Sequence, residues 1–306
     1  MSTFRIIVMG TPEFAVPSLN ALVENGKNVV AVVTAPDKPA GRGLKLQTSP
    51  IKDAALLHNI PVLQPANLKS PEFLEELKSF KADLQIVIAF RMLPQAVWAM
   101  PPYGTFNLHA SLLPQYRGAA PINWAIINGE KETGLTTFLL KQEIDTGDIL
   151  LQEKEKIEPN DTAGTLYERL MNKGAGLVLK TVELIESENY TLQPQIMTDT
   201  IKQAPKIHKE TCRIDWNKTS EEVRNFIRGL SPYPAAWTIL ATKNCKIYKT
   251  EVVSSNTTNK IPGEYVTDGK SYLHFFASDG IIAVEELQLE GKKRMEIKEF
   301  LRGNKL

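Results

Sequence analysis

The sequence has few of the residues that build disulfide frameworks and zinc sites. Its 306 residues include two cysteines, Cys212 and Cys245, and four histidines. Neither cysteine belongs to a paired metal-ligand spacing, so the pattern argues against both a disulfide scaffold and a metal centre. This cysteine usage is typical of a reducing compartment, and we expect a cytoplasmic protein without a bound metal.

Long hydrophobic runs and an excess of one charge are also lacking. No apolar run approaches the roughly 18 residues that cross a membrane, and residues 1–5 lead directly into a predicted strand, so we expect neither a membrane partner nor a targeting peptide. The net charge is +1, but it is divided unevenly. From Lys206 onward 17 Lys and Arg face 13 Asp and Glu, whereas the preceding residues have 19 against 22. The asymmetry predicts a basic C-terminal surface.

Apolar strands that alternate with capped helices predict an α/β fold for the first part of the chain. Strands are expected at 5–10, 29–33, 61–63 and 82–90, with helices at 12–24, 50–58 and 70–80 between them. This alternation is typical of a Rossmann-like open twisted sheet. Only Gly10 stands where a dinucleotide site needs three spaced glycines, so a nicotinamide or flavin site is poorly supported.

The remainder of the chain indicates a second, smaller domain. A hairpin (135–141 and 148–157) and a helix (162–187) are followed by polar residues without clear periodicity, and then by a helix at 221–230 and short alternating strands. Such a series predicts a small β-barrel of the OB-like kind. We expect a catalytic domain at 1–189, a linker at 190–205 and the barrel-like domain at 206–306.

Asn107 and His109 form the first candidate site. They are two residues apart in a short apolar strand, so their side chains should project from the same face near its carboxyl end, where open α/β sheets bind ligands. A histidine at a strand end is, however, more often structural than catalytic. The next residues, Ser111, Leu112, Leu113 and Pro114, offer backbone groups and an apolar wall on which a flat, heteroatom-rich ring could lie.

The whole run from Asn107 to Gly118 resembles the signature of the 10-formyltetrahydrofolate-dependent formyltransferases. Asn-x-His-x-Ser-Leu-Leu-Pro-x-Tyr-Arg-Gly is matched without a gap. The family's partner motif is Asp-Thr-Gly, which stands here at Asp145 to Gly147, although the same residues are also an ordinary turn signal. The resemblance implies 10-formyltetrahydrofolate as co-substrate and Asn107, His109 and Asp145 as the catalytic group.

A second wall of the folate site is expected beside the Asn107 strand. Phe90, Arg91, Met92 and Leu93 end or follow the buried strand at 82–90. The resemblance implies that these four residues bind the folate together with residues 111–114. The family more often has a small residue where Arg91 stands.

The connection at 34–50 is unusually long for a strand-to-helix loop. Its glycines and prolines are expected to prevent regular structure, and Lys38, Arg42 and Lys45 are opposed only by Asp37. Composition alone is equally compatible with a solvated loop. The loop is similar to the basic insertion by which methionyl-tRNA formyltransferases approach the acceptor stem, which implies that these three cations bind initiator methionyl-tRNA. The family also implies a monomer.

Formyl transfer between two nitrogens passes through a tetrahedral intermediate with a negative oxygen. Asn107 could donate a hydrogen bond to that oxygen, His109 could donate or transfer a proton, and Asp145 could orient the imidazole or relay protons. We therefore expect formylation of the methionine on initiator tRNA. The alternatives are an amino sugar or sugar nucleotide acceptor, a glycinamide ribonucleotide acceptor, which would leave the residues from Lys206 onward without an evident role, and a folate- or RNA-binding module with a relic site.

Overall fold

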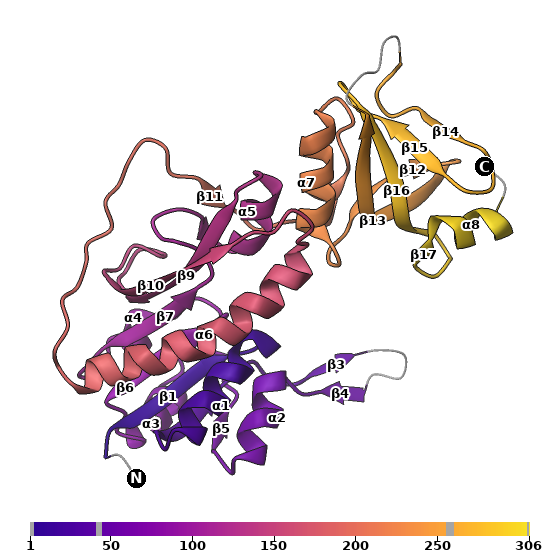
Figure 1. The fold of residues 1–306 in the computed structure, drawn as a ribbon. Helices are drawn as coiled ribbons and strands as arrows, with labels where there is room; N and C mark the ends of the chain where they lie inside the picture. Colours follow the sequence, from indigo (N-terminus) through magenta and orange to yellow (C-terminus); the bar gives the residue numbers. More distant parts are fainter. Residues whose placement is uncertain (1–2, 41–44, 255–259, 305) are drawn as a thin grey trace. The chain divides into compact units, whose positions relative to one another are not determined.

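The computed structural model describes residues 3–40, 45–254, 260–304 and 306. The chain divides into two compact units (Figure 1). The first comprises Met1–Arg117, Gly134–Glu155 and Tyr167–Lys202, and the second comprises Gly118–Thr133, Lys156–Leu166 and Gln203–Leu306. Within the described ranges, no helix is both long and apolar enough to cross a membrane.

The described residues of the first unit form a seven-stranded sheet with the strand order β10-β9-β7-β6-β1-β2-β5. Strand β7 is parallel to β6 and antiparallel to β9, and β1 is parallel to both β2 and β6. This topology confirms the predicted Rossmann-like sheet. The strands are β1 (Arg5–Gly10), β2 (Asn28–Val33), β5 (Val62–Leu63), β6 (Leu84–Ile88), β7 (Thr105–His109), β9 (Glu132–Leu139) and β10 (Ile149–Lys156).

Helices pack against the sheet as the sequence pattern requires. Helices α2 (Pro50–Leu57) and α3 (Pro71–Ser79) each begin with a serine N-cap and a proline in the first turn. Helix α3 shares one core cluster with alternate residues of β1, Ile7 and Met9. The other helices of this region are η1 (Glu13–Ala15), α1 (Val16–Glu24), α4 (Gln95–Trp98) and α6 (Ala163–Glu186).

Helix α6 lies close to the sheet at β7 and β9. A Cβ added to Gly174 would lie 2.8 Å from the Leu108 side chain, and the Thr137 and Thr181 hydroxyls are 2.9 Å apart. Because successive strand residues alternate between faces, Asn107 and His109 project from the face opposite Leu108. The two candidate side chains therefore share a face, as predicted.

Two local predictions were wrong. The helix predicted from Pro12 begins as the 3₁₀ turn η1 and becomes α-helical at Val16. The connection at 34–50 is not wholly irregular, because β3 (Lys38–Ala40) pairs with β4 (Lys45–Gln47) as an antiparallel ribbon. Pro39 is tolerated there because each strand of a two-stranded ribbon has an outer edge that requires no backbone N–H.

The second unit contains the predicted barrel-like sheet. Its described strands are antiparallel in the order β12-β13-β16-β15-β14, with β17 on β16. Three register shifts between β13 and β16 add local bends, and the sheet is curled as a half-barrel. The strands are β12 (Ala236–Leu240), β13 (Lys243–Ser254), β14 (Tyr265–Thr267), β15 (Leu273–Phe276), β16 (Ile281–Leu289) and β17 (Met295–Glu296).

Helix α7 (Ser220–Leu230) of this unit packs against α5 (Pro121–Ile127), which lies far earlier in the chain. Asn123 donates a hydrogen bond to the Gly229 carbonyl at 2.8 Å. The unit therefore includes residues from before the expected linker, and the boundaries at 189/190 and 205/206 stay predictions. The remaining elements are β8 (Arg117–Gly118), β11 (Gln203–Ala204), η2 (Lys209–Cys212) and α8 (Ile297–Gly303).

Candidate active site

The carboxyl ends of β6 and β7 bring the two predicted folate-binding segments to one edge of the sheet. The strands are parallel neighbours, with Ile88 opposite Leu108. Residues 89–93 and 110–114 therefore leave the sheet side by side. His109, the last residue of β7, lies at this edge.

His109 is 6% exposed, and each of its ring nitrogens faces a polar group. Its Nε2 lies 2.9 Å from the Tyr116 carbonyl oxygen, and its Nδ1 lies 3.8 Å from Oδ2 of Asp145. A carbonyl oxygen can only accept, so Nε2 carries the hydrogen and Nδ1 of the neutral ring has the free lone pair. The edge-on Phe138 ring, with centroids 6.5 Å apart, supports the imidazole from the side.

Asp145 reaches His109 from the connection between β9 and β10. It adopts a left-handed backbone conformation with φ of 55°, which aspartate tolerates better than most residues. Two positions later the turn lies directly on the end of β9: a Cβ at Gly147 would lie 1.5 Å from the Leu139 carbonyl oxygen. The Asp-Thr-Gly motif thus has a steric reason, because only glycine permits this approach.

The Asn107 side chain is half-buried on the same face as His109. In the ranges that the structure describes, its amide makes no hydrogen bond to another protein group. Its N–H donors are therefore available to a ligand at this edge. The structure brings all three predicted catalytic residues to one region of the first unit.

Ser111, Leu113 and Leu93 are buried, unlike the other residues expected to bind folate. The Ser111 hydroxyl donates to the Gln115 carbonyl at 2.6 Å, and the Leu113 N–H donates to the Thr136 hydroxyl at 3.1 Å. These polar groups hold the loop after β7 in shape. These groups would contribute to a ligand site by fixing the position of the loop.

Four other predicted folate residues are accessible. Phe90, Leu112 and Pro114 are half-buried, and Met92 is 73% exposed. Their role as an apolar wall of a folate site stays a prediction.

The Arg91 side chain binds backbone carbonyls of the protein itself. Its guanidinium donates to the Ala66 carbonyl at 3.1 Å and to the Pro65 carbonyl, and it lies 5.6 Å from the centre of the Phe90 ring. Burial lowers the pKa of Arg91. Arg91 therefore joins the wall to residues 65–66.

The basic connection is anchored at its base by a network that the sequence did not indicate. Lys52 in α2 lies 2.5 Å from Asp37, and Gln64 donates to the same carboxylate at 2.8 Å. The hydrogen bond from Lys52, followed by that from Gln64, lowers the pKa of Asp37. Lys38 is exposed and Lys45 begins β4, whereas Arg42 lies outside the described residues.

Thr136, Gln152 and Gln195 also shape the site, and the sequence analysis missed them. Gln152 donates to the Leu113 carbonyl at 2.8 Å and to Thr136 at 2.9 Å. Gln195 donates to the Asp145 carbonyl at 2.9 Å. They are ordinary polar residues of strands and of the expected linker, so no local sequence signal distinguishes them.

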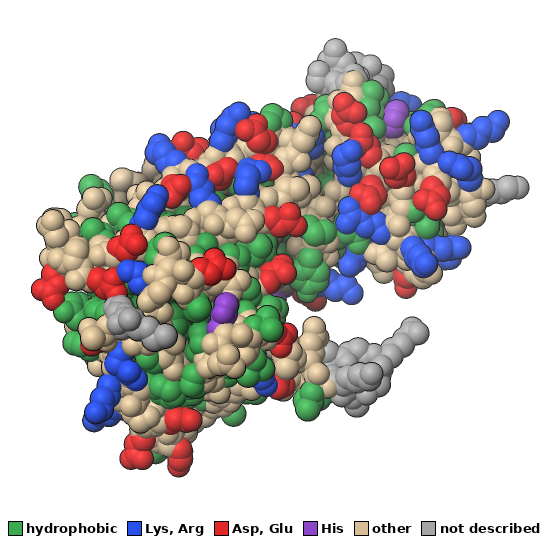
Figure 2. All heavy atoms as spheres, turned by 60° about the horizontal axis from the view of Figure 1, so that its bottom comes forward, with side chains coloured by type: hydrophobic (Ala, Val, Ile, Leu, Met, Phe, Trp, Pro, Cys, Tyr) green, Lys and Arg blue, Asp and Glu red, His purple; other side chains and the backbone are tan. Residues whose placement is uncertain are grey.

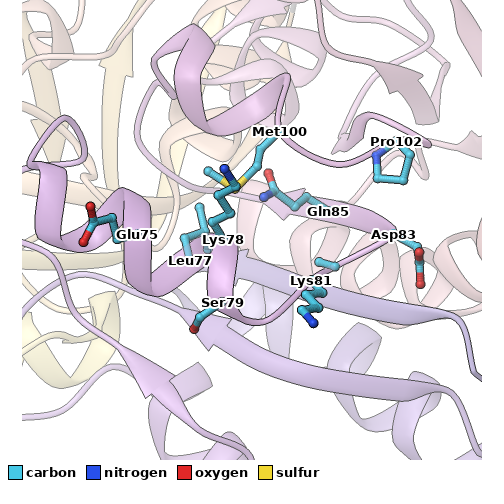
Figure 3. A pocket seen from close by; sticks show the side chains of 10 residues that line it. Glu75, Leu77, Lys78, Ser79, Lys81, Asp83, Gln85, Met100 and Pro102 are labelled. Atoms are coloured by element: carbon cyan, nitrogen blue, oxygen red, sulfur yellow. The ribbon is translucent and has the colours of Figure 1, made fainter.

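A separate hollow lies at the opposite, amino-terminal end of β6 (Figure 3). Gln85 in its wall accepts a hydrogen bond from Thr105 at 3.1 Å. Figure 3 shows Lys78, Lys81 and Asp83 around it. The residues described here contain no cluster of three His, Cys, Asp or Glu side chains that could hold a metal ion.

The fold, together with matches to two family models, defines a formyl transferase. A formyl transferase family model matches residues 4–182, and the model of the C-terminal domain of formyl transferases matches residues 206–305. The chain belongs to the formyl transferase family.

Similar proteins are named methionyl-tRNA formyltransferase. The protein from Bacteroides fragilis is 53% identical over 306 residues, which cover 98% of this chain and 94% of that protein. The protein from Azobacteroides pseudotrichonymphae is 55% identical over 313 residues, which cover 99% and 97%.

Solved structures share the fold at lower identity. The sugar 3N-formyl transferase WlaRD, solved in the presence of dTDP and 5-N-formyl-THF, is 23% identical, with a TM-score of 0.69 and coverage of 96% of this chain and 100% of that chain. HypX from Aquifex aeolicus in complex with tetrahydrofolic acid is 19% identical, with a TM-score of 0.67. The match covers 98% of this chain but about half of HypX, 47%.

Proposed function

We propose that the protein transfers the formyl group of 10-formyltetrahydrofolate to the methionine amino group of initiator methionyl-tRNA, for translation initiation. The observation that carries this proposal is the placement of His109 between the Tyr116 carbonyl and Asp145, beside the available amide of Asn107. The relatives named methionyl-tRNA formyltransferase, which match nearly the whole chain, support the choice of acceptor.

Asn107 is proposed to stabilise the tetrahedral intermediate. The amine nitrogen forms a bond to the formyl carbon, and the negative charge moves to the formyl oxygen before the bond to the folate nitrogen breaks. An amide donor directed at that oxygen contributes about 3 kcal/mol in comparable sites. Asn107 suits this role because no protein group competes for its N–H donors in the described structure.

His109 and Asp145 are proposed to transfer the proton that the amine loses and the folate nitrogen gains. Since Nε2 is bound to the Tyr116 carbonyl, Nδ1 is the nitrogen that can take up the proton. The imidazolium would then have a carbonyl on one side and the Asp145 carboxylate on the other. The 3.8 Å between Nδ1 of His109 and Oδ2 of Asp145 is longer than a direct hydrogen bond, so a water molecule or the amine would relay the proton between them.

The formyl donor is proposed to lie at the carboxyl edge, against Phe90, Met92, Leu112 and Pro114. Two structural neighbours were solved with tetrahydrofolate compounds, HypX with tetrahydrofolic acid and WlaRD with 5-N-formyl-THF, which supports a folate at this fold. The 10-formyl compound carries the activated carbon itself, so none of the steps assigned to these residues requires a metal ion.

The acceptor tRNA is proposed to contact the basic connection, through Lys38, Arg42 and Lys45, and the second unit. Asp37, at the base of this connection, binds Lys52 in α2. Figure 2 shows Lys and Arg side chains over the C-terminal unit, mixed with Asp and Glu. Phosphate contacts release counterions, so tRNA binding should weaken steeply as salt rises.

The main rival acceptor is an amino sugar nucleotide, because WlaRD, a sugar 3N-formyl transferase, shares the fold. The deciding experiment is formyl transfer from 10-formyltetrahydrofolate to charged initiator tRNA, charged elongator tRNA and an amino sugar nucleotide in parallel. We expect transfer to initiator tRNA alone. Transfer only to the sugar nucleotide would overturn the proposal that initiator tRNA is the acceptor, and transfer to none of the three would favour a binding module.

Arg42→Ala tests the basic connection. Activity on tRNA should fall sharply, whereas Lys69→Ala, outside the connection, should leave it unchanged. An unaltered rate for Arg42→Ala would remove the role proposed for this residue. The monomeric state and the cytoplasmic location also stay proposals.

A further inference from the structure

Residues 193–202, within the expected linker, form hydrogen bonds with the candidate active-site region of the first unit. Gln193 exchanges two backbone hydrogen bonds with Ile149 at the start of β10, at 2.8 and 3.0 Å. At the other end, the Lys202 carbonyl accepts from the Tyr116 N–H at 2.7 Å, and the Lys202 N–H donates to the Gln115 side chain at 2.9 Å. The segment therefore spans from β10 to the loop after β7.

Gln195, in the middle of this segment, uses both ends of its amide. Its Nε2 donates to the Asp145 carbonyl at 2.9 Å and to the Gly147 carbonyl at 2.8 Å. Its Oε1 accepts from Nη2 and Nε of Arg117, at 2.6 and 3.1 Å. One side chain thus joins the Asp-Thr-Gly turn to the arginine of the Asn107–Gly118 signature.

Both polar neighbours of the His109 ring depend on this segment. Tyr116, whose carbonyl accepts from Nε2, is bound through its N–H to Lys202, and Asp145 is bound through its carbonyl to Gln195. Tyr116 and Asp145 have φ values of 60° and 55°. Such conformations persist where surrounding contacts stabilise them.

We propose that Gln195 is a positioning residue, which fixes the Asp145 carboxylate relative to Nδ1 of His109. The proposal rests on the proposed function, since it acts through the role given to Asp145. Gln195 binds the backbone carbonyls of the turn, and the Asp145 carboxylate lies 3.8 Å from Nδ1 of His109. Loss of its two donors would break the link between the turn and Arg117, which removes one of the contacts that set the 3.8 Å separation.

The test compares two glutamines of the same segment. Gln195→Ala should lower kcat by about 10- to 100-fold, the usual effect of misplacing a catalytic group by about 1 Å, with the KM for tRNA changed less than about twofold. Gln193→Ala is the matched control, because its exposed side chain makes no hydrogen bond among the described residues, and it should retain full kcat. Gln195→Glu keeps the acceptor for Arg117 but loses both donors, so it should also be impaired.

A double-mutant cycle separates positioning from a general structural effect. If Gln195 acts through Asp145, Gln195→Ala should cost less than about twofold in an Asp145→Asn background. Multiplicative effects, or a Gln195→Ala enzyme with normal kcat, would overturn the proposal. If Gln195→Ala does not fold, Gln195→Glu enters the same cycle. Full activity of Asp145→Asn alone would instead contradict the proposed function.

Discussion

Gly147→Ala should disable the enzyme without a change in any catalytic side chain. A Cβ at this position would lie 1.5 Å from the Leu139 carbonyl oxygen, whereas ordinary Cβ contacts begin near 3.4 Å. The turn would therefore have to retreat by about 1.9 Å, and it carries Asp145 with it. Since a displacement of about 1 Å can cost about 100-fold, we expect kcat to fall by at least that factor.

Gly176→Ala is the matched control, because an added Cβ there has nothing within 4 Å and the residue lies inside α6. Alanine is favoured over glycine in a helix by about 1 kcal/mol, so this variant should be slightly more stable and fully active. Overpacking at Gly147 should lower the free energy of unfolding by about 1–3 kcal/mol.

The assay is formyl transfer to initiator methionyl-tRNA with both substrates saturating, together with urea unfolding of each variant. The unfolding curves show whether the variant is folded at the assay temperature. A folded Gly147→Ala protein that retains more than a third of the wild-type kcat would refute the steric argument. The same result would weaken the role given to Asp145.

Three further predictions concern single contacts. Asn107→Ala should reduce the single-turnover rate by about 100- to 1,000-fold, and a loss below tenfold would exclude it as the oxyanion donor. Arg228→Met removes buried donors to the Asp161 carbonyl, at 3.0 Å, and to the Asn225 side chain, at 2.7 Å, and should lower the free energy of unfolding in urea by about 1–3 kcal/mol; unchanged stability would show that these acceptors find other partners. Asp37→Asn tests the anchor of the basic connection: because Lys52 lowers the pKa of Asp37, its stabilisation should be complete above the ordinary value of about 3.9 and disappear as pH falls through the lowered pKa. A stability difference between wild type and variant that does not change with pH would contradict this anchor.

Local sequence patterns were sufficient for most secondary structure. Ser49-Pro50 and Ser70-Pro71 mark helix starts because serine accepts an N-terminal N–H and proline fits the first turn. The ribbon at 38–47 was missed because its stability depends on pairing across the connection, which composition does not report.

Motifs selected the candidate catalytic residues, but the physical reasons for those motifs came from the structure. Asn107 and His109 share a face because strand geometry alternates every residue. Position 147 requires glycine because the Leu139 carbonyl lies against it, and the motif alone does not indicate this contact. Likewise, no local sequence pattern indicates that Asp37 binds Lys52 in α2.

The sequence by itself determined the order of strands and helices, the Asn107–His109 pair and the Asp-Thr-Gly turn, because these depend on neighbours within a few residues. Only the tertiary structure decided which nitrogen of His109 faces Asp145 and that Gln195 holds the turn. Gln195 and Asp145 are 50 positions apart in the chain. Polar contacts at that separation depend on how the chain packs, and a single glutamine in a polar stretch carries no sign of its partner.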